Sequence, residues 1–330
     1  MQSKLDTRFN SAYPGSYALT FEQKTSFTFN DDKRINLFKY LKDGRIAITW
    51  DDYEEQTELE IYDPTNNFHL DMKIPFEQSE AIWNMVELDN GTLIIFAAIP
   101  LDEYQMNLKV MYKMINLNKD SFTMNSYVIQ EETTQMEIQS FLYPIQGSIF
   151  VSFCQKGELN IWNGALPFNT TPIKKIIYAH PLFKALYCKK GNYLLIKHNE
   201  PIIIDIMDMN TYEIIHKIEN LNFRRVWPFD ENRLLYSNVN PNIISYFFMD
   251  KGNSEKIENL DENEVTDILT LRDGNLLLLY EKENKIVVYD IKKKKWSISL
   301  EHDSNFDEFY PRDNYSFATI DNNKVFLWKY

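Results

Sequence analysis

The sequence is poor in the residues that build disulfides, metal sites and phosphate-binding loops. It contains 2 cysteines, 5 histidines and 9 glycines among 330 residues. Cys154 and Cys188 cannot form a disulfide framework, and no cysteine or histidine spacing matches a zinc site. Nucleophile elbows and glycine-rich phosphate loops are missing as well. We therefore expect no catalytic residue, no metal and no cofactor.

Long apolar runs and an excess of positive charge are also absent. The longest apolar stretches, near Leu93–Ile99 and Leu276–Tyr280, are too short to span a bilayer. The first ten residues are polar, which does not predict a secretory signal. Lys and Arg total 35 against 48 Asp and Glu, for a net charge of −13, which disfavours nucleic acid and favours a basic partner. We expect a cytoplasmic protein without a membrane span, whose partners are other proteins.

Five of the nine glycines occupy the same position in a sequence pattern that the chain repeats seven times. Each copy has an apolar run, a polar turn, a second apolar run, a loop and a third run that ends near an aromatic and a polar residue. The first turns of the copies contain, in order, Gly44, Gly91, Gly147, Gly191, Asn232, Gly274 and Asn314. These turns lie 47, 56, 44, 41, 42 and 40 residues apart, a period that is typical of propeller blades.

The sixth copy shows the pattern most clearly. Val265–Leu271 alternates as a strand does, and Asp273-Gly274 favours a hairpin turn because glycine tolerates positive φ. Leu276–Tyr280 is continuously apolar, as a strand buried on both faces would be. Lys285–Asp290 and Trp296–Leu300 complete the copy. Each copy is therefore predicted to be four antiparallel strands, and the fold class to be an all-β, seven-bladed propeller.

The last copy stops after its third strand, at Tyr330. An alternating stretch, Thr25–Phe29, precedes the first copy and is predicted to supply the missing strand, which would close the ring without an unpaired edge. We expect residues 1–16 to form an N-terminal arm and residues 17–330 to form one propeller. The blade cores are predicted near 33–76, 82–126, 138–176, 183–217, 223–257, 265–300 and 306–330 together with 25–29.

The ends of the third strands carry a family resemblance. Ile61-Tyr62-Asp63, Ile161-Trp162-Asn163, Val288-Tyr289-Asp290 and Leu327-Trp328-Lys329 stand where WD40 repeats have their Trp-Asp pair. The chain resembles a degenerate WD40-repeat propeller over nearly its whole length. It has no Gly-His pair, so the hydrogen-bonded tetrad that typifies strict repeats cannot be rebuilt. The resemblance implies the propeller fold and a non-catalytic role as a protein-interaction scaffold, and it transfers no site residues.

Acidic residues concentrate in two of the four kinds of loop. Loops from a fourth strand to the next first strand, and from a second strand to the third, should share one face, and few basic residues are found among them. We predict that a basic segment of a partner protein binds there, although acidic loops would also serve solubility alone. The candidate partner-binding residues are Asp51, Asp52, Tyr53, Glu54, Tyr104, Glu131, Glu132, Tyr178, Asp261, Glu262 and Phe306.

Two other functions stay open. Phe223-Arg224-Arg225 resembles the Phe-Arg-Arg-Gly motif of phosphoinositide-binding propellers, and two adjacent arginines could bind a phosphate through forked donors. Val226 replaces the glycine, and the triplet continues into an apolar run, which places it on an inner strand away from any membrane surface. A propeller hydrolase would need converging catalytic groups at the channel mouth, and no such motif is found.

Overall fold

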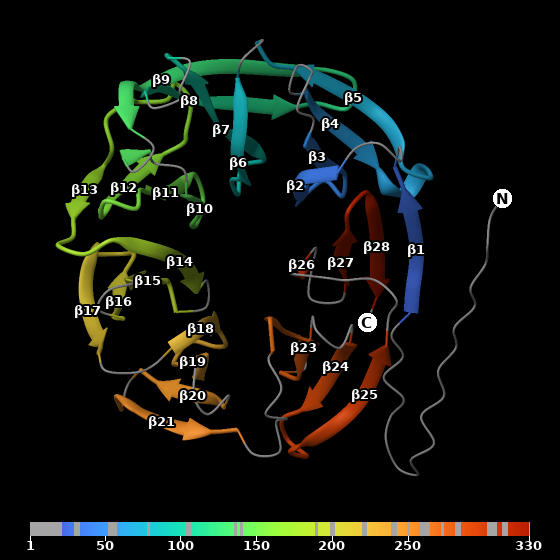
Figure 1. Cartoon of the computed structure of the whole chain (residues 1–330), viewed down its shortest axis with the longest axis vertical. Helices are drawn as coiled ribbons and strands as arrows, with labels where there is room; N and C mark the ends of the chain where they lie inside the picture. Colours follow the sequence, from blue (N-terminus) through green and yellow to red (C-terminus); the bar gives the residue numbers. More distant parts are fainter. Residues whose placement is uncertain are drawn as a thin grey trace. The chain divides into compact units, whose positions relative to one another are not determined.

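The computed structural model describes residues 22–29, 34–51, 58–77, 80–102, 107–134, 137–138, 141–188, 191–198, 202–219, 223–238, 243–249, 251–257, 265–271, 274–280, 285–301, 309–311 and 316–329. These residues form seven four-stranded antiparallel sheets and one short 3-10 helix, Pro64–Asn66 (Figure 1). The fold is the predicted seven-bladed β-propeller, and each sheet is one blade.

In every sheet neighbouring strands are hydrogen-bonded in the same order, and we call them the first, second, third and fourth strand. The first strands are β2 (Arg34–Tyr40), β6 (Ala81–Glu87), β10 (Phe141–Pro144), β14 (Leu182–Cys188), β18 (Phe223–Pro228), β22 (Asp267–Thr270) and β26 (Tyr310–Pro311). The second strands are β3 (Ile46–Asp51), β7 (Thr92–Pro100), β11 (Ile149–Phe153), β15 (Tyr193–His198), β19 (Arg233–Asn238), β23 (Leu276–Tyr280) and β27 (Ser316–Asp321).

The third and fourth strands complete the sheets. The third strands are β4 (Glu58–Asp63), β8 (Asn107–Leu117), β12 (Glu158–Asn163), β16 (Ile204–Asp208), β20 (Ile244–Phe248), β24 (Lys285–Asp290) and β28 (Lys324–Lys329). The fourth strands are β5 (His69–Pro75), β9 (Phe122–Thr134), β13 (Lys174–Ile177), β17 (Glu213–Ile218), β21 (Asn253–Lys256), β25 (Lys295–Glu301) and β1 (Glu22–Thr28). The sheets are numbered below from the first (β2–β5) to the seventh (β26–β28 with β1).

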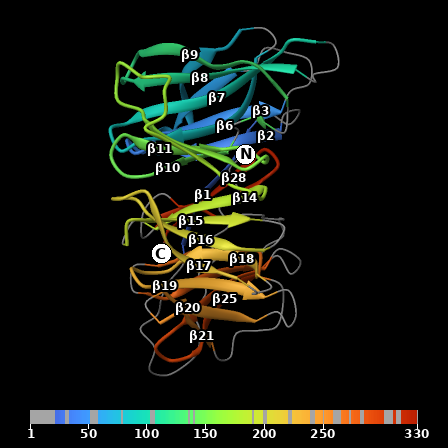
Figure 2. The same cartoon turned by 90° about the vertical axis from the view of Figure 1, so that its left-hand side faces the viewer.

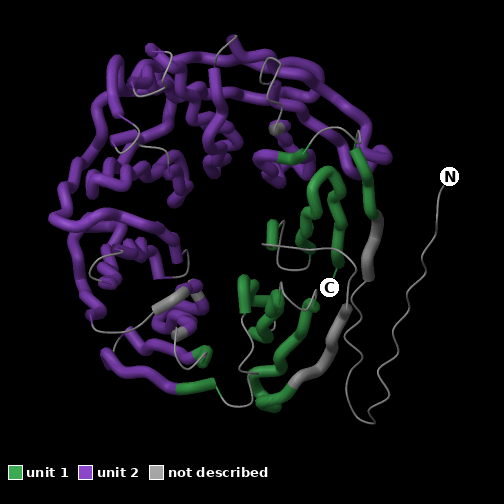
Figure 3. The backbone as a smooth tube through the Cα atoms, viewed as in Figure 1, with its two compact units in different colours: residues 1–35, 240–244, 256–330 green, residues 36–239, 245–255 purple. Residues whose placement is uncertain are grey.

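The chain divides into two compact units (Figure 3). Unit 1 contains residues 1–35, 240–244 and 256–330, and unit 2 contains residues 36–239 and 245–255. Within unit 2, the first strands of the second, third, fourth and fifth sheets contact one another in turn. The fourth strands, β9, β13 and β17, lie on the outer side (Figure 1).

The N-terminal strand completes the seventh sheet, within unit 1. β1 pairs antiparallel with β28, and in that register Phe27 lies opposite Val325 and Thr28 opposite Lys324. The next residue, Phe29, is buried, and its N–H donates to the carbonyl oxygen of Asn323 at 3.0 Å. The predicted pairing of the N-terminus with the last third strand is therefore confirmed.

The first turns have the geometry that their glycines require. Gly44, Gly91, Gly147 and Gly274 all have positive φ, between 67° and 93°. In the fourth sheet the positive φ is found at Asn192, with 51°, next to Gly191. Asparagine tolerates positive φ better than most other residues with a side chain, so Asn192 can take the turn conformation that glycine takes in the other sheets.

The third-strand aromatic residues belong to the core, as predicted. Trp162 is 2% exposed and packs with residues of the second and third sheets, including Tyr112 at 5.6 Å between ring centroids. Its indole N–H donates to Ser152 Oγ at 2.8 Å. Trp328 has the same bond to Thr319 Oγ1, at 2.9 Å, and packs among residues of the sixth and seventh sheets. Tyr289 is fully buried.

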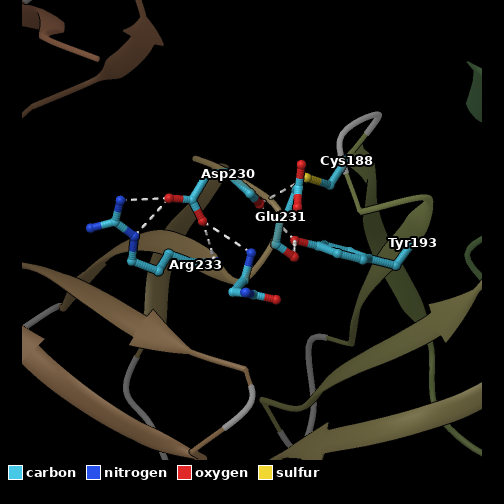
Figure 4. Close-up of polar contacts among 6 residues, drawn as sticks. Cys188, Tyr193, Asp230, Glu231 and Arg233 are labelled. Atoms are coloured by element: carbon cyan, nitrogen blue, oxygen red, sulfur yellow. Dashed lines mark hydrogen bonds and ion pairs between the residues drawn. The ribbon is translucent and has the colours of Figure 1, made fainter.

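Polar contacts at the first turns join neighbouring sheets. Asp89 of the second sheet accepts from Lys42 Nζ of the first at 2.5 Å and from the backbone N–H of Gly147 of the third at 2.7 Å. Between the fourth and fifth sheets, the Tyr193 hydroxyl donates to the carbonyl oxygen of Asp230 at 2.7 Å (Figure 4). Hydrogen bonds of a single side chain at these turns thus hold neighbouring sheets together.

We expect Asp89→Ala to lower the free energy of unfolding by about 1–2 kcal/mol, because two hydrogen bonds that join three sheets are lost. Chemical denaturation monitored by tryptophan fluorescence measures this. Asp120→Ala, at an exposed turn of the same sheet, is the control and should change stability by less than about 0.5 kcal/mol. Equal stability of both variants would show that the Asp89 bonds do not join the sheets effectively.

Candidate functional site

The predicted interaction face consists of the loops from second to third strands and from fourth strands to the next first strands. Of the candidate residues, Asp52, Tyr53, Glu54, Tyr104, Asp261, Glu262 and Phe306 lie outside the described residues. The backbone of Asp51 ends β3, and its side chain is likewise outside the description. The candidates that can be placed are Glu131, Glu132 and Tyr178.

Glu131 and Glu132 lie in a strand, whereas the sequence placed them in a loop. β9 continues to Thr134 because it pairs with the long third strand β8 as far as Asn107. Both glutamates are exposed near the end of β9 that leads into the interaction face. The Glu131 side chain is 78% exposed, and its Oε2 lies 3.4 Å from Lys109 Nζ. This lysine offsets part of the negative charge.

A buried ion pair involves another acidic residue of these loops. Glu80, in the loop before β6, is 3% exposed, and its Oε2 lies 2.7 Å from the Nζ of Lys113, which is equally buried. Lys113 Nζ also lies 5.1 Å from the centre of the Phe76 ring. Glu80 therefore supports the fold and is not available to a partner.

Tyr178 is half-buried, and the expectation that it is an exposed aromatic anchor is wrong. Its ring packs edge-on against His198, with centroids 4.9 Å apart, and its hydroxyl is enclosed. Burial raises the pKa of the Tyr178 phenol, and the nearby Asp205 carboxylate raises it further. The ring turns inward because it joins the apolar cluster between the third and fourth sheets.

Two exposed aromatic residues on this face were not predicted. Trp83 of β6 is 38% exposed, and Phe183 of β14 is 51% exposed. Each is the extra residue of a β-bulge near the start of a first strand, which interrupts the pairing with the second strand. The sequence signal is the spacing of apolar residues. Ile82 and Met85, both buried in the structure, are three residues apart in one strand, whereas simple alternation would space them by two.

The end of the second sheet combines apolar and acidic groups. Leu101, in the loop from β7 to β8, is 50% exposed, and its backbone N–H donates to the carbonyl oxygen of Asn107 at 2.9 Å. Asp102 Oδ2 accepts from the backbone N–H of Asn107 at 2.9 Å. With Trp83, Glu131 and Glu132, these residues lie at one end of one sheet, which we name the sheet-two end.

Comparison with known proteins identifies the fold. A chain of a structure titled "Crystal Structure of Mitotic Checkpoint Complex" matches with a TM-score of 0.66 and 12% identity, over 100% of this chain and 98% of that one. The WD40 β-propeller domain of Doa1 matches with a TM-score of 0.59 and 11% identity, over 94% and 97%. This chain has the fold of a WD40 β-propeller. No family model and no curated protein matches its sequence.

The WD40-like fold places the Arg224-Arg225 pair on an inner strand, as expected. Both residues belong to β18, the first strand of the fifth sheet, and Arg225 lies opposite Ser237 of β19. Burial lowers the pKa of Lys197, and Lys184 and Arg225 lower it further. Lys197 Nζ also lies 5.1 Å from the Phe183 ring centre. Lipid binding by the two arginines stays a prediction.

Within the described parts of the WD40-like propeller, no three His, Cys, Asp or Glu side chains are grouped so that they could hold a metal ion. The same residues include no helix that is long and apolar enough to cross a membrane. Cys154 and Cys188 are free thiols, and both are buried.

Proposed function

We propose that this protein is a non-catalytic interaction platform, a subunit of a larger protein complex, that binds a basic segment of a partner protein. The WD40 fold and the two structural neighbours support the class of function, since one neighbour was solved within a complex. Fold alone does not determine function, so the proposal depends on a particular surface.

The observation that carries the proposal is the composition of the sheet-two end. Trp83 and Leu101 expose apolar surface, and Trp is among the residues that contribute most to binding energy at protein interfaces. Glu131 and Glu132 are exposed acidic residues at the same end of the sheet. A partner segment with an apolar residue flanked by lysine or arginine would bury its apolar side chain against Trp83 and place its positive charges near the glutamates.

The test is recovery of partner proteins with tagged full-length chain from the source cells, measured by quantitative mass spectrometry. We expect Glu131→Lys with Glu132→Lys, and separately Trp83→Ala, to reduce recovery of the same partner at least about tenfold. Recovery by the wild type should fall as salt rises, because screening weakens the attraction between exposed charges.

Two matched controls are available in the chain. Asp71→Lys reverses an exposed acidic residue on β5, away from the sheet-two end, and Phe183→Ala removes the equivalent bulge aromatic of the fourth sheet. Both should retain the partner. Full recovery by the double glutamate variant and by Trp83→Ala, with folding intact by circular dichroism, would place the contact elsewhere.

A further inference from the structure

One loop of the third sheet is longer than the same loop of its neighbours. Loops from a third to a fourth strand comprise residues 118–121 in the second sheet, 209–212 in the fourth and 291–294 in the sixth. In the third sheet, β12 ends at Asn163 and β13 begins at Lys174, so the loop comprises residues 164–173. β13 lies on the outer side of unit 2 in Figure 1, the side that faces the viewer in Figure 2. A loop longer than its turn requires is a place to look for function.

This loop is anchored at two points and exposed between them. Phe168 is 7% exposed, and its ring packs against Trp162 with centroids 5.9 Å apart. The backbone N–H of Ile173 donates to the carbonyl oxygen of Ile161 at 2.7 Å. The residues between these anchors are all at least partly exposed, and they are Asn169, Thr170, Thr171 and Pro172. The structure therefore holds the middle of the loop out to solvent.

The exposed part of the loop has a distinctive sequence. The chain contains 12 prolines, and Pro172 is the only one that directly follows a serine or threonine. Lys174, at the third position after Thr171, is exposed, and so is Lys175. Thr171 thus combines an accessible hydroxyl group with an adjacent proline and a nearby cation. No other serine or threonine in the chain has this combination.

We propose that Thr171 is phosphorylated by a proline-directed protein kinase, with ATP as the phosphate donor. A kinase of this class selects proline after the threonine because proline has no backbone N–H that would be left unpaired in the complex. The charge of Lys174 adds selectivity, since kinases also distinguish substrates by their charge pattern. Thr170 is equally exposed but is followed by Thr171, so it lacks the proline.

The phosphoryl transfer forms one bond and breaks one. Thr171 Oγ1 bonds to the γ-phosphorus of ATP, the bond from that phosphorus to the bridging oxygen breaks, and ADP leaves. The hydroxyl proton passes to a carboxylate of the kinase. Thr171 and Pro172 precede β13, and β13 is the last strand of its sheet, so a kinase can reach this segment without separating paired strands.

The phosphate should change the surface and leave the fold intact. It adds about −1.5 to −2 charge at pH 7. The backbone N–H of Thr171 donates to Asn169 Oδ1 at 2.9 Å, a contact within the exposed part of the loop. Loops from a third to a fourth strand lie at the other end of the strands from the sheet-two end. The inference is therefore independent of the proposed partner site.

Phosphorylation of the full-length protein with radioactive ATP and a purified cyclin-dependent kinase tests recognition of the segment. The wild type should be labelled, and Thr171→Ala should lose the label. Pro172→Ala should lower kcat/KM for the protein at least about tenfold, and Lys174→Glu should lower it as well. Thr170→Ala is the matched control and should be labelled as the wild type is. Thermal melting by circular dichroism should be the same for all variants, because the exchanged side chains are at least partly exposed.

Mass spectrometry of the tagged chain from the source cells, purified with phosphatase inhibitors, tests whether the site is used. Trypsin releases a peptide of residues 157–174 in which Thr170 and Thr171 are the only residues with a hydroxyl group. Fragment ions that separate the two threonines locate the phosphate, and we expect it on Thr171. Absence of phosphate from Thr171 in these cells, or a label that Pro172→Ala leaves unchanged, would overturn the proposal.

Discussion

Deletion of residues 1–30 should produce a chain that aggregates or does not fold. The deletion removes β1, which forms the outer edge of the seventh sheet, and exposes the paired edge of β28. An unpaired strand edge is a template for association with other chains. It also removes Phe29, which is buried, and its contact with Phe27 at 4.7 Å between ring centroids.

The stabilisation that this deletion removes is large compared with the total free energy of unfolding of a typical protein. Burial of one phenylalanine contributes about 1.5–3 kcal/mol, and the lost ladder hydrogen bonds each contribute about 1 kcal/mol, against a typical total of about 5–15 kcal/mol. Size-exclusion chromatography and thermal melting by circular dichroism measure the result. Deletion of residues 1–16, the arm predicted to lie before the propeller, is the matched control and should leave both unchanged. A soluble 31–330 chain with the wild-type melting temperature would show that β1 is dispensable.

Replacement of Trp162 by alanine should lower the free energy of unfolding by about 3–5 kcal/mol. The ring is 2% exposed and packs against Phe150 and Phe168 as well as Tyr112. Truncation leaves a cavity between the second and third sheets and removes the indole N–H that donates to the Ser152 hydroxyl. Urea denaturation with a fluorescence signal measures the change.

Two substitutions separate the causes of this loss. Trp162→Phe keeps an aromatic ring but removes the indole N–H, and it should cost less than Trp162→Ala. Trp83→Ala truncates an exposed tryptophan and should change stability by less than about 1 kcal/mol. If Trp162→Ala unfolds at the same urea concentration as the wild type, the ring does not belong to the core in solution.

The spacing of the repeat predicted the fold because each feature of it is local. A glycine turn, an apolar run and a third strand with an aromatic residue recur around Gly44, Gly91 and Gly274. In the structure each of these glycines has positive φ and donates its N–H to the carbonyl oxygen three residues earlier. The pairing of Phe27 with the last third strand was also predictable. The seventh copy lacks a fourth strand and the N-terminus offers one, so the repeat count alone identifies the partner.

The sequence predicted the interaction face less well. It identified loops that share a face, but it could not identify which side chains turn inward. Glu80 and Tyr178 are in such loops, yet Glu80 is buried against Lys113 and Tyr178 against His198. A loop residue can turn toward the core whenever the neighbouring sheet offers a partner, and that partner is distant in sequence.

The sequence by itself determined the number of blades, their strands and the source of the last strand, because turn chemistry and strand periodicity act between near neighbours along the chain. Only the tertiary structure decided which residues a partner could reach. The bulges at Trp83 and Phe183 turn aromatic rings to solvent, and the bulge at Ile215 exposes two isoleucines together. A bulge depends on the register between two strands, and exposure depends on the sheet beside it. Neither the positions of the bulges nor the exposure of these side chains is defined until the strands have paired.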